Sequence, residues 1–317
     1  MKIGLIDLDG KLPNLALMKL SSYYKSQGHT VALNDFSADK LYCSVVFGRN
    51  RSKAEQLSAQ YQNMVIGGTG WDLSIKLAPE IHNCAPDYDL YSTEFIYDRI
   101  KRGIGKKENK IKKAERVVNA GIGFSSRGCV RKCGFCIVPK SEGTFSQENE
   151  IKDLLNPKSN VLILLDNNLT ADPNVLDKLR EIKERGLVVD VTQGIDVRLL
   201  TPEIAKAFSQ VKHLRSIHYA WDLMNFEKSV IEGIGILSGF IRPYRQMCFM
   251  LTGYDTSFEE DVYRFRKLRS LGIAPYVMVY NEIQDLRLKH FERWVNGRYH
   301  KVCEFADYEP WAKVQYV

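Results

Sequence analysis

Short apolar runs alternate with helical patterns along most of the chain, and this alternation restricts the fold more than any other feature. In the second half, six apolar runs follow one another, at residues 120–125, 160–166, 188–192, 216–220, 246–251 and 276–280. Most are separated by segments with apolar residues at helical spacing, such as PNVLDKLREIKERG and SFEEDVYRFRKLRSLG. Because parallel strands need a long crossover that is usually a helix, the alternation predicts an α/β fold with parallel strands.

The number of these strand–helix units sets the expected architecture. Six units are fewer than the eight of a complete TIM barrel, so we expect a partial (β/α)6 TIM-like barrel at residues 119–284. Residues 1–95 alternate in the same way, through KIGLIDLD, HTVALND, YCSVVFG and NMVIGGTG, and predict a Rossmann-like parallel α/β domain. We expect a basic linker at residues 96–118. The aromatic and basic tail at residues 285–317 predicts one more helix, packed on the core.

Composition excludes several classes of protein. The 317 residues are 44% hydrophobic and 26% charged, as in globular proteins. No run approaches 18 apolar residues, and the start MKIGLIDLDG carries acidic residues unlike a signal peptide. The chain has seven cysteines, an odd number that argues against a secreted disulfide framework. We therefore expect a protein of the reducing cytoplasm, with no membrane partner.

The net charge of +7 is unevenly distributed. The segment KRGIGKKENKIKKAER, residues 101–116, has eight Lys or Arg against two Glu. Such a segment is either a solvated linker or exposed helix, or a contact for nucleic acid or another polyanion. No aromatic residue is interleaved with these charges, so stacking on bases has no support.

Three cysteines are crowded into FSSRGCVRKCGFC, residues 124–136. Cys129, Cys133 and Cys136 are spaced C-x3-C-x2-C and follow the first strand of the expected barrel, on the face where barrel sites are built. Zinc would need a fourth cysteine or a histidine; no histidine is near in sequence, and Cys248 and Cys303 are isolated. An iron–sulfur cubane normally takes four cysteines, so three leave one iron with an open position.

The triplet, with aromatic Phe135 just before the last cysteine, resembles the signature of the radical S-adenosylmethionine (SAM) superfamily. The resemblance covers residues 119–281 by motifs and residues 1–91 more weakly. It implies that Cys129, Cys133 and Cys136 hold a [4Fe–4S] cluster and that SAM binds the open iron. It further implies an enzyme that receives an electron from a donor such as flavodoxin or ferredoxin and cleaves SAM to a 5′-deoxyadenosyl radical. That radical would start hydrogen abstraction from, or methylation of, an unknown substrate.

The same resemblance assigns SAM contacts to residues at other strand ends. Asp166, Asn167 and Asn168 stand where the family contacts the SAM amino group, in place of the commoner Gly-Gly-Glu. Their oxygens suit an ammonium group, although Asn is also an ordinary turn residue. Arg198 suits the SAM carboxylate, with an internal ion pair to Asp196 as the alternative.

Two further strand ends complete the expected SAM site. Asp222 is placed to accept from the ribose hydroxyls, and Gly253 would let the backbone approach the adenine unless it is a plain turn glycine. His218, inside the fourth strand, is either a core histidine or a proton donor to the substrate.

The first domain resembles the cobalamin-binding domain of other radical SAM enzymes. PNLALMKLSSYYKSQGHTV is similar to its first helix, and VIGGTG to the glycine turn that faces the corrin, which gives Gly67, Gly68 and Gly70 as candidate contacts. The D-x-H-x-x-G motif that supplies a cobalt-ligating histidine is absent. The domain therefore either binds cobalamin without that histidine or is a cofactor-free unit that shapes the substrate pocket.

Two other functions stay open at this point. One is a nucleic-acid-contacting protein with a non-catalytic iron–sulfur cluster, supported by the basic linker and tail. The other is a structural zinc protein.

Overall fold

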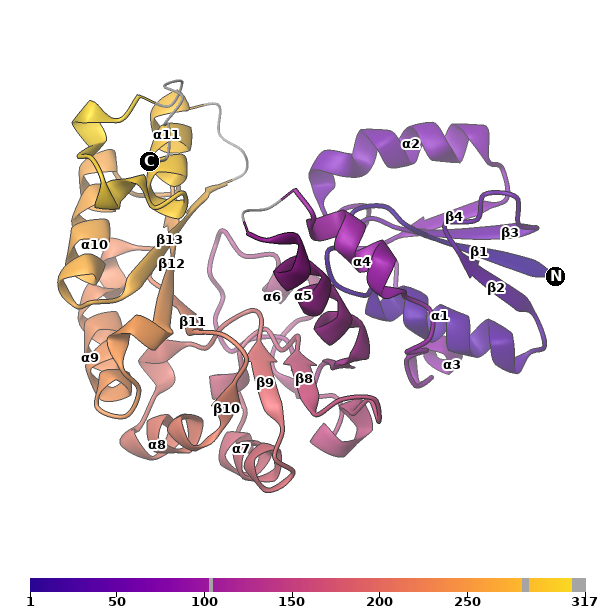
Figure 1. Ribbon diagram of the computed structural model, residues 1–317, viewed down its shortest axis with the longest axis horizontal. Helices are drawn as coiled ribbons and strands as arrows, with labels where there is room; N and C mark the ends of the chain where they lie inside the picture. Colours follow the sequence, from indigo (N-terminus) through magenta and orange to yellow (C-terminus); the bar gives the residue numbers. More distant parts are fainter. Residues whose placement is uncertain (103–104, 281–284, 310–317) are drawn as a thin grey trace. The chain divides into compact units, whose positions relative to one another are not determined.

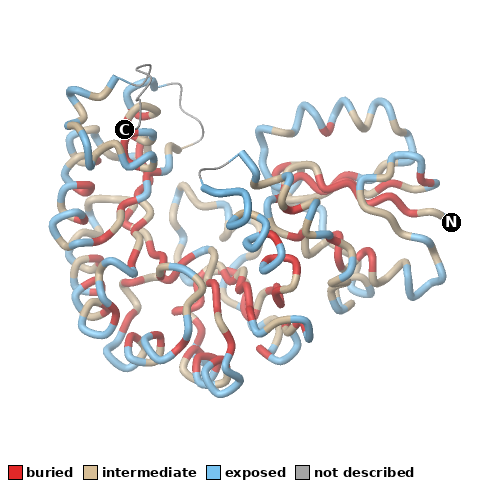
Figure 2. Tube along the Cα trace, viewed as in Figure 1, coloured by how far each residue is buried: buried red, intermediate tan, exposed pale blue. Residues whose placement is uncertain are grey.

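The computed structural model describes residues 1–102, 105–280 and 285–309 and is a mixed α/β protein with parallel sheets (Figure 1). The chain divides into two compact units. The first unit contains Met1–Gly123, Ile137–Gly143 and Asn149–Ile163. The second unit contains Phe124–Cys136, Thr144–Glu148 and Leu164–Val317. Within each unit the buried residues concentrate on the strands and on the helix faces packed against them (Figure 2).

The first unit is built on a four-stranded parallel sheet of order β2-β1-β3-β4. Its strands are β1 (Lys2–Asp7), β2 (Thr30–Leu33), β3 (Lys40–Ser44) and β4 (Met64–Gly67). The helices α1 (Leu15–Ser26) and α2 (Arg51–Gln60) cover its two faces. This is the Rossmann-like arrangement expected from the sequence, in which crossover helices bury both faces of the sheet.

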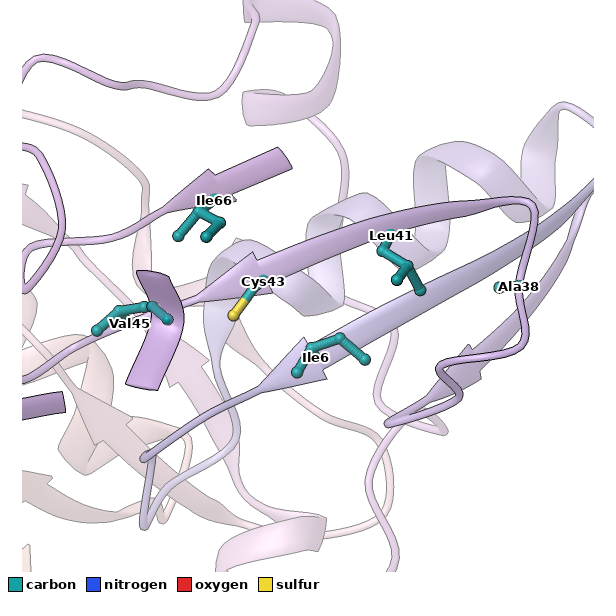
Figure 3. Packing of buried hydrophobic residues seen from close by; sticks show 7 residues of the cluster. Ile6, Ala38, Leu41, Cys43, Val45 and Ile66 are labelled. Carbon is teal, nitrogen blue, oxygen red and sulfur yellow. The ribbon is translucent and has the colours of Figure 1, made fainter. Parts of the chain in front are cut away.

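The two faces of this sheet follow from the alternation of side chains along β1. Ile3 and Leu5 point to one face and pack with Leu17 and Leu20 of α1. Ile6 points to the other face, into a cluster that includes Ala54 of α2 (Figure 3). Full burial of each large aliphatic side chain contributes about 1.5–3 kcal/mol, so these contacts hold α1 strongly, whereas α2 buries only the small side chain of Ala54.

The expected basic linker contains regular structure. The remaining helices of the first unit are α3 (Pro79–His82), α4 (Thr93–Ile100), α5 (Lys107–Asn119) and α6 (Val138–Ser141). Helix α5 carries most of the basic segment and buries Ala114, Val117 and Val118 along one side. The sequence left a solvated linker or an exposed helix open for this segment, and the structure shows a helix with exposed lysines.

The second unit contains the strands β9 (Val188–Val191), β10 (Lys212–His213), β11 (Ile217–Ala220), β12 (Gln246–Thr252) and β13 (Ala274–Val279), and the antiparallel pair β6 (Ser126–Arg127) and β7 (Ser146–Gln147). Its helices are α7 (Val175–Glu184), α8 (Pro202–Gln210), α9 (Glu227–Ser238), α10 (Phe258–Ser270) and α11 (Leu286–Asn296). Helix α11 is the helix expected in the tail, and Asn296 exchanges hydrogen bonds with both backbone groups of Val277 on β13. Across the described ranges, no helix is both long and apolar enough to cross a membrane.

All six strands expected in the second half of the chain are present. They are β5 (Gly121–Gly123), β8 (Val161–Leu164), β9, β11, β12 and β13. They lie in two sheets, of order β10-β9-β8-β5 and β11-β12-β13, and a parallel bridge pairs Ile195, after β9, with Tyr219 of β11. The α/β class is confirmed, while one continuous partial barrel remains a prediction.

Candidate metal centre

The cysteine loop begins at two serines that are anchored by a buried carboxylate. Asp166, which follows β8, is completely buried. Its Oδ1 accepts from Ser125 N at 2.8 Å, and its Oδ2 accepts from Ser126 N at 2.7 Å and from the two serine hydroxyls at 2.6 and 2.7 Å. Both oxygens are therefore engaged within the protein. The sequence assigned Asp166 to the SAM amino group, whereas in the structure it positions the start of the cysteine loop.

A buried lysine of α7 supports the first of these serines, Ser125. Lys178 Nζ donates to the Ser125 carbonyl at 3.1 Å and to its hydroxyl at 3.0 Å, and forms an ion pair with Asp172. The side chains of Lys178 and Asp172 are 7% and 0% exposed. A buried charge is tolerated only when it is paired and hydrogen-bonded, and here the lysine is paired with Asp172 and donates to Ser125. The entry to the cysteine loop is thus fixed by a fully buried polar network.

Asn168, which also follows β8, contacts a cysteine directly. Asn168 is 5% exposed, and its Nδ2 lies 3.4 Å from the Sγ of Cys129. Its Oδ1 accepts from the hydroxyl of Thr170 at 2.9 Å. Asn167, which lies between Asp166 and Asn168 in the sequence, is half-buried. Of the three residues assigned to the SAM amino group, Asn168 is therefore committed to a cysteine sulfur.

A third anchor comes from the segment after β9. Asp196 accepts from Arg131, inside the cysteine loop, at 2.9 Å and forms a bidentate pair with Arg198 at 2.7 and 3.0 Å. Burial alone would raise the pKa of the Asp196 carboxyl, but its bonds to Arg198 and Arg131 hold that pKa below its usual value. The internal ion pair that was the alternative role of Arg198 is present. It ties the cysteine loop to this segment.

The residue before the last cysteine, Phe135, begins a row of three aromatic rings in contact. The ring of Phe135 meets Tyr254, just after β12, edge to face with centroids 5.3 Å apart. Tyr254 in turn meets Tyr280, just after β13, at 4.9 Å. Edge-to-face pairs at these distances are favourable beyond the area they bury. The loop is therefore packed against the ends of two further strands.

The three thiols are half-buried and close enough to influence one another. Burial raises the pKa of the Cys133 thiol; positive Arg198 opposes this rise, while Cys136, Asp222 and Cys129 add to it. Within the described part of the chain, no three His, Cys, Asp or Glu side chains are gathered as ligands of one metal ion. The tetrahedral ligands of a zinc ion lie within about 4 Å of each other, whereas a cubane binds each thiolate through a different iron. The donor set, three thiols in one anchored loop, fits the cluster.

Asp222 and Arg198 both act on the Cys133 thiol although they are far from it in the sequence. Asp222 accepts from Leu251 N at 3.1 Å, and burial raises the pKa of its carboxyl. The segment that carries it is held by Arg264 of α10, which is fully buried and donates to the carbonyls of Trp221 and Leu251. Two of the predicted SAM contacts, carried by other segments of the second unit, thus influence the electrostatics of the Cys133 thiol.

Gly253 and His218, the remaining candidates of the second unit, differ in their surroundings. Gly253 has φ 79°, a left-handed conformation that favours glycine, and borders a cavity of about 660 Å³. The His218 side chain is buried, and burial lowers the pKa of its ring. Its ring lies 5.3 Å from that of Phe249, and its Nδ1 has no hydrogen-bond partner among the described residues. The core interpretation of His218 therefore agrees with its burial.

The glycine turn of the first unit is filled by the chain itself. A Cβ on Gly68 would lie 2.3 Å from the Val45 carbonyl oxygen, and one on Gly70 would lie 2.5 Å from the backbone of Phe47. A Cβ on Gly67 would make an ordinary contact with Ile75. Gly68 and Gly70 are thus required by close packing of the chain on itself, and their assignment as corrin contacts stays a prediction.

Sequence reasoning did not identify several residues of this region. Thr170, Lys178, Tyr254 and Arg264 all contact the cysteine loop or the strand ends beside it. Lys178 and Arg264 lie at buried positions of amphipathic helices, where a charged residue is unusual. A charged residue at a buried helical position was therefore the sequence feature that could have identified Lys178 and Arg264.

No protein-family model matches the sequence, and no curated protein is similar to it. Among solved structures, the chain is similar to Streptococcus suis SuiB bound to the precursor peptide SuiA, with a TM-score of 0.39 and 14% identity over 67% of this chain and 55% of that one. It is also similar to SuiB bound to S-adenosylmethionine, with a TM-score of 0.38 and 13% identity over 65% of this chain and 56% of that one. The chain spans a little over half the length of these structures.

Proposed function

We propose that the protein is a radical SAM enzyme in which Cys129, Cys133 and Cys136 hold a [4Fe–4S] cluster. The observation that carries the proposal is that one loop holds all three cysteines and is anchored by Asp166, through Ser125 and Ser126, and by Asp196, through Arg131. Three thiolates leave one iron of a cubane open. An anchored loop with three cysteines therefore supports a cluster whose fourth iron binds SAM.

The residues of the second unit have separate tasks in this proposal. Asp166, Asp196 and Tyr254 hold the loop from three directions, so the thiols are positioned before the cluster binds. When bound, the cluster and SAM supply the one-electron chemistry that starts radical reactions. The protein orients SAM, keeps water out and presents the substrate. The strands around the loop form a partial (β/α)6 barrel in this proposal.

Four of the predicted residues keep a SAM-binding role. Asp222, with one oxygen bound to Leu251 N, accepts from the ribose hydroxyls, and Gly253 lies at the adenine. Arg198 uses Nε and Nη2 for Asp196, and its Nη1 edge binds the SAM carboxylate. Asn167 accepts from the amino group, since the oxygens of Asp166 are engaged with Ser125 and Ser126. An electron donor such as flavodoxin or ferredoxin reduces the cluster.

Cobalamin binding has no support from the residues of the first unit. The space beside Gly68 and Gly70 is occupied by the backbone of Val45 and Phe47. At the same edge of the sheet, Tyr91 donates to the buried Asp7 at 2.8 Å and Arg99 donates to the Leu8 carbonyl at 3.0 Å. We therefore assign no corrin chemistry to this unit and favour hydrogen abstraction over cobalamin-assisted methylation.

Anaerobic reconstitution with iron and sulfide tests the proposal. We expect about four irons per chain and release of 5′-deoxyadenosine from SAM under dithionite. Cys133→Ala should lose the iron, and the matched change Cys248→Ser, at a buried cysteine in β12, should keep it. A cluster without SAM cleavage would favour the nucleic-acid-contacting alternative. A colourless protein with tightly bound zinc would refute the iron assignment.

A further inference from the structure

One side-chain amide contacts a cysteine sulfur from outside the loop. Asn168 Nδ2 lies 3.4 Å from the Sγ of Cys129, a normal N–H···S distance, and the residue is 5% exposed. Cys129 Sγ also accepts from the backbone N–H of Arg131 at 3.4 Å. Two N–H donors therefore point at one thiolate, in a site with little water to compete for it.

The orientation of this amide is set by its other neighbours. The backbone N–H of Asp196 donates to Thr170 Oγ1 at 2.9 Å, and the Thr170 hydroxyl lies 2.9 Å from Asn168 Oδ1. With the N–H of Asp196 on its oxygen, the hydroxyl has two acceptors, Asn168 Oδ1 at 2.9 Å and the Asp196 carbonyl at 3.2 Å, and the shorter bond to Oδ1 directs Nδ2 to the sulfur. A flipped amide would place its oxygen against a thiolate, an unfavourable contact between two acceptors.

We propose that Asn168 is a positioning residue that raises the reduction potential of the cluster through this hydrogen bond. The inference rests on the proposed function, since it requires the cluster on Cys129. Reduction adds one electron from an external low-potential reductant and makes the cluster and its thiolates more negative. A hydrogen-bond donor at a ligand sulfur stabilises that form more than the oxidised one. Asn168 thereby makes the reduced, reactive state easier to reach.

The test compares reduction potentials in the full chain. Wild type, Asn168→Leu, Asn168→Asp and Thr170→Val are reconstituted anaerobically without SAM and titrated with dithionite, and the reduced cluster is followed by its EPR signal. Asn168→Leu removes the donor, and Asn168→Asp replaces it with a negative oxygen of the same shape. Asn174→Leu, at an exposed position without a side-chain capping bond, is the matched control.

We expect the potential to fall in the order wild type, Asn168→Leu, Asn168→Asp. An about tenfold smaller equilibrium constant for reduction in Asn168→Leu corresponds to 59 mV for one electron. Thr170→Val, which leaves Asn168 in place but frees its amide, should give a smaller shift of the same sign. Asn174→Leu should leave the potential unchanged.

The outcomes separate the two proposals. Equal potentials in all iron-loaded variants, or a rise in Asn168→Leu, would overturn the role of Asn168 while leaving the cluster intact. Absence of iron from the wild type would instead refute the proposed function. If neither Asn168 variant binds iron, the reduction potential of Thr170→Val tests the inference instead. A potential equal to that of the wild type in Thr170→Val counts against the inference.

Discussion

Removal of the Asp166 carboxylate should destabilise the second unit and disorder the cysteine loop. In Asp166→Ala, the backbone N–H groups of Ser125 and Ser126 lose their acceptor, and these residues are 0% and 2% exposed. An unsatisfied buried donor costs about 1–3 kcal/mol, so we expect a loss of about 2–6 kcal/mol in the free energy of unfolding. Asp166→Asn retains one accepting oxygen and should lose about 1–3 kcal/mol.

Urea unfolding measures this loss, with fluorescence of Trp221 and Trp294 of the second unit as the signal. With a urea m-value of about 2 kcal/mol/M, a loss of 4 kcal/mol, near the middle of the range, lowers the midpoint by about 2 M. Hydrogen exchange of the peptide at residues 120–136 should accelerate, because the two amides lose their protection.

The matched control is Asp72→Ala. Asp72 also accepts from the backbone N–H and hydroxyl of a serine, Ser74, at 2.8 and 2.7 Å, but it is exposed. Water replaces the lost acceptor there, so stability should stay near that of the wild type. If Asp166→Ala unfolds at the wild-type urea midpoint and its loop amides stay protected, the anchoring role is refuted.

Three further predictions concern the same region and the first unit. Phe135→Ala removes the ring that meets Tyr254 and should lower iron retention during gel filtration, whereas iron content equal to wild type would show that the aromatic contact does not hold the loop. The pKa of Asp196 is lowered in the folded protein, so its pairs with Arg198 and Arg131 stabilise the fold above the unfolded pKa of about 3.9, and this stabilisation is lost as the pH falls through the folded pKa. Asp196→Asn should therefore be less stable than the wild type at pH 7, and its free energy of unfolding should depend less on pH below about 4. Urea titrations at several pH values check both outcomes. Hydroxocobalamin added during purification should not be retained, and a stoichiometric corrin absorbance would contradict the closed glycine turn.

The strand pattern was readable in the sequence because each long strand carries its own apolar run. All six strands expected in the second half exist, and the two faces of the first sheet follow from alternation along β1. The two-residue strands β6, β7 and β10 were not predicted, since two residues carry no periodicity. The helix of the basic segment and the helix of the tail could be anticipated from local spacing alone.

The sequence by itself determined the chemistry on offer: three thiols at C-x3-C-x2-C spacing in a loop after a strand. Only the tertiary structure decided which polar groups near that loop are available. Asp166, Asn168 and Arg198 were equivalent candidates as isolated residues, yet the first is taken by two serines, the second faces a cysteine and the third pairs with Asp196. The partners of Asp166 and Asn168 lie about forty residues away in the chain, and a hydrogen bond depends on distance in space, which local sequence does not encode.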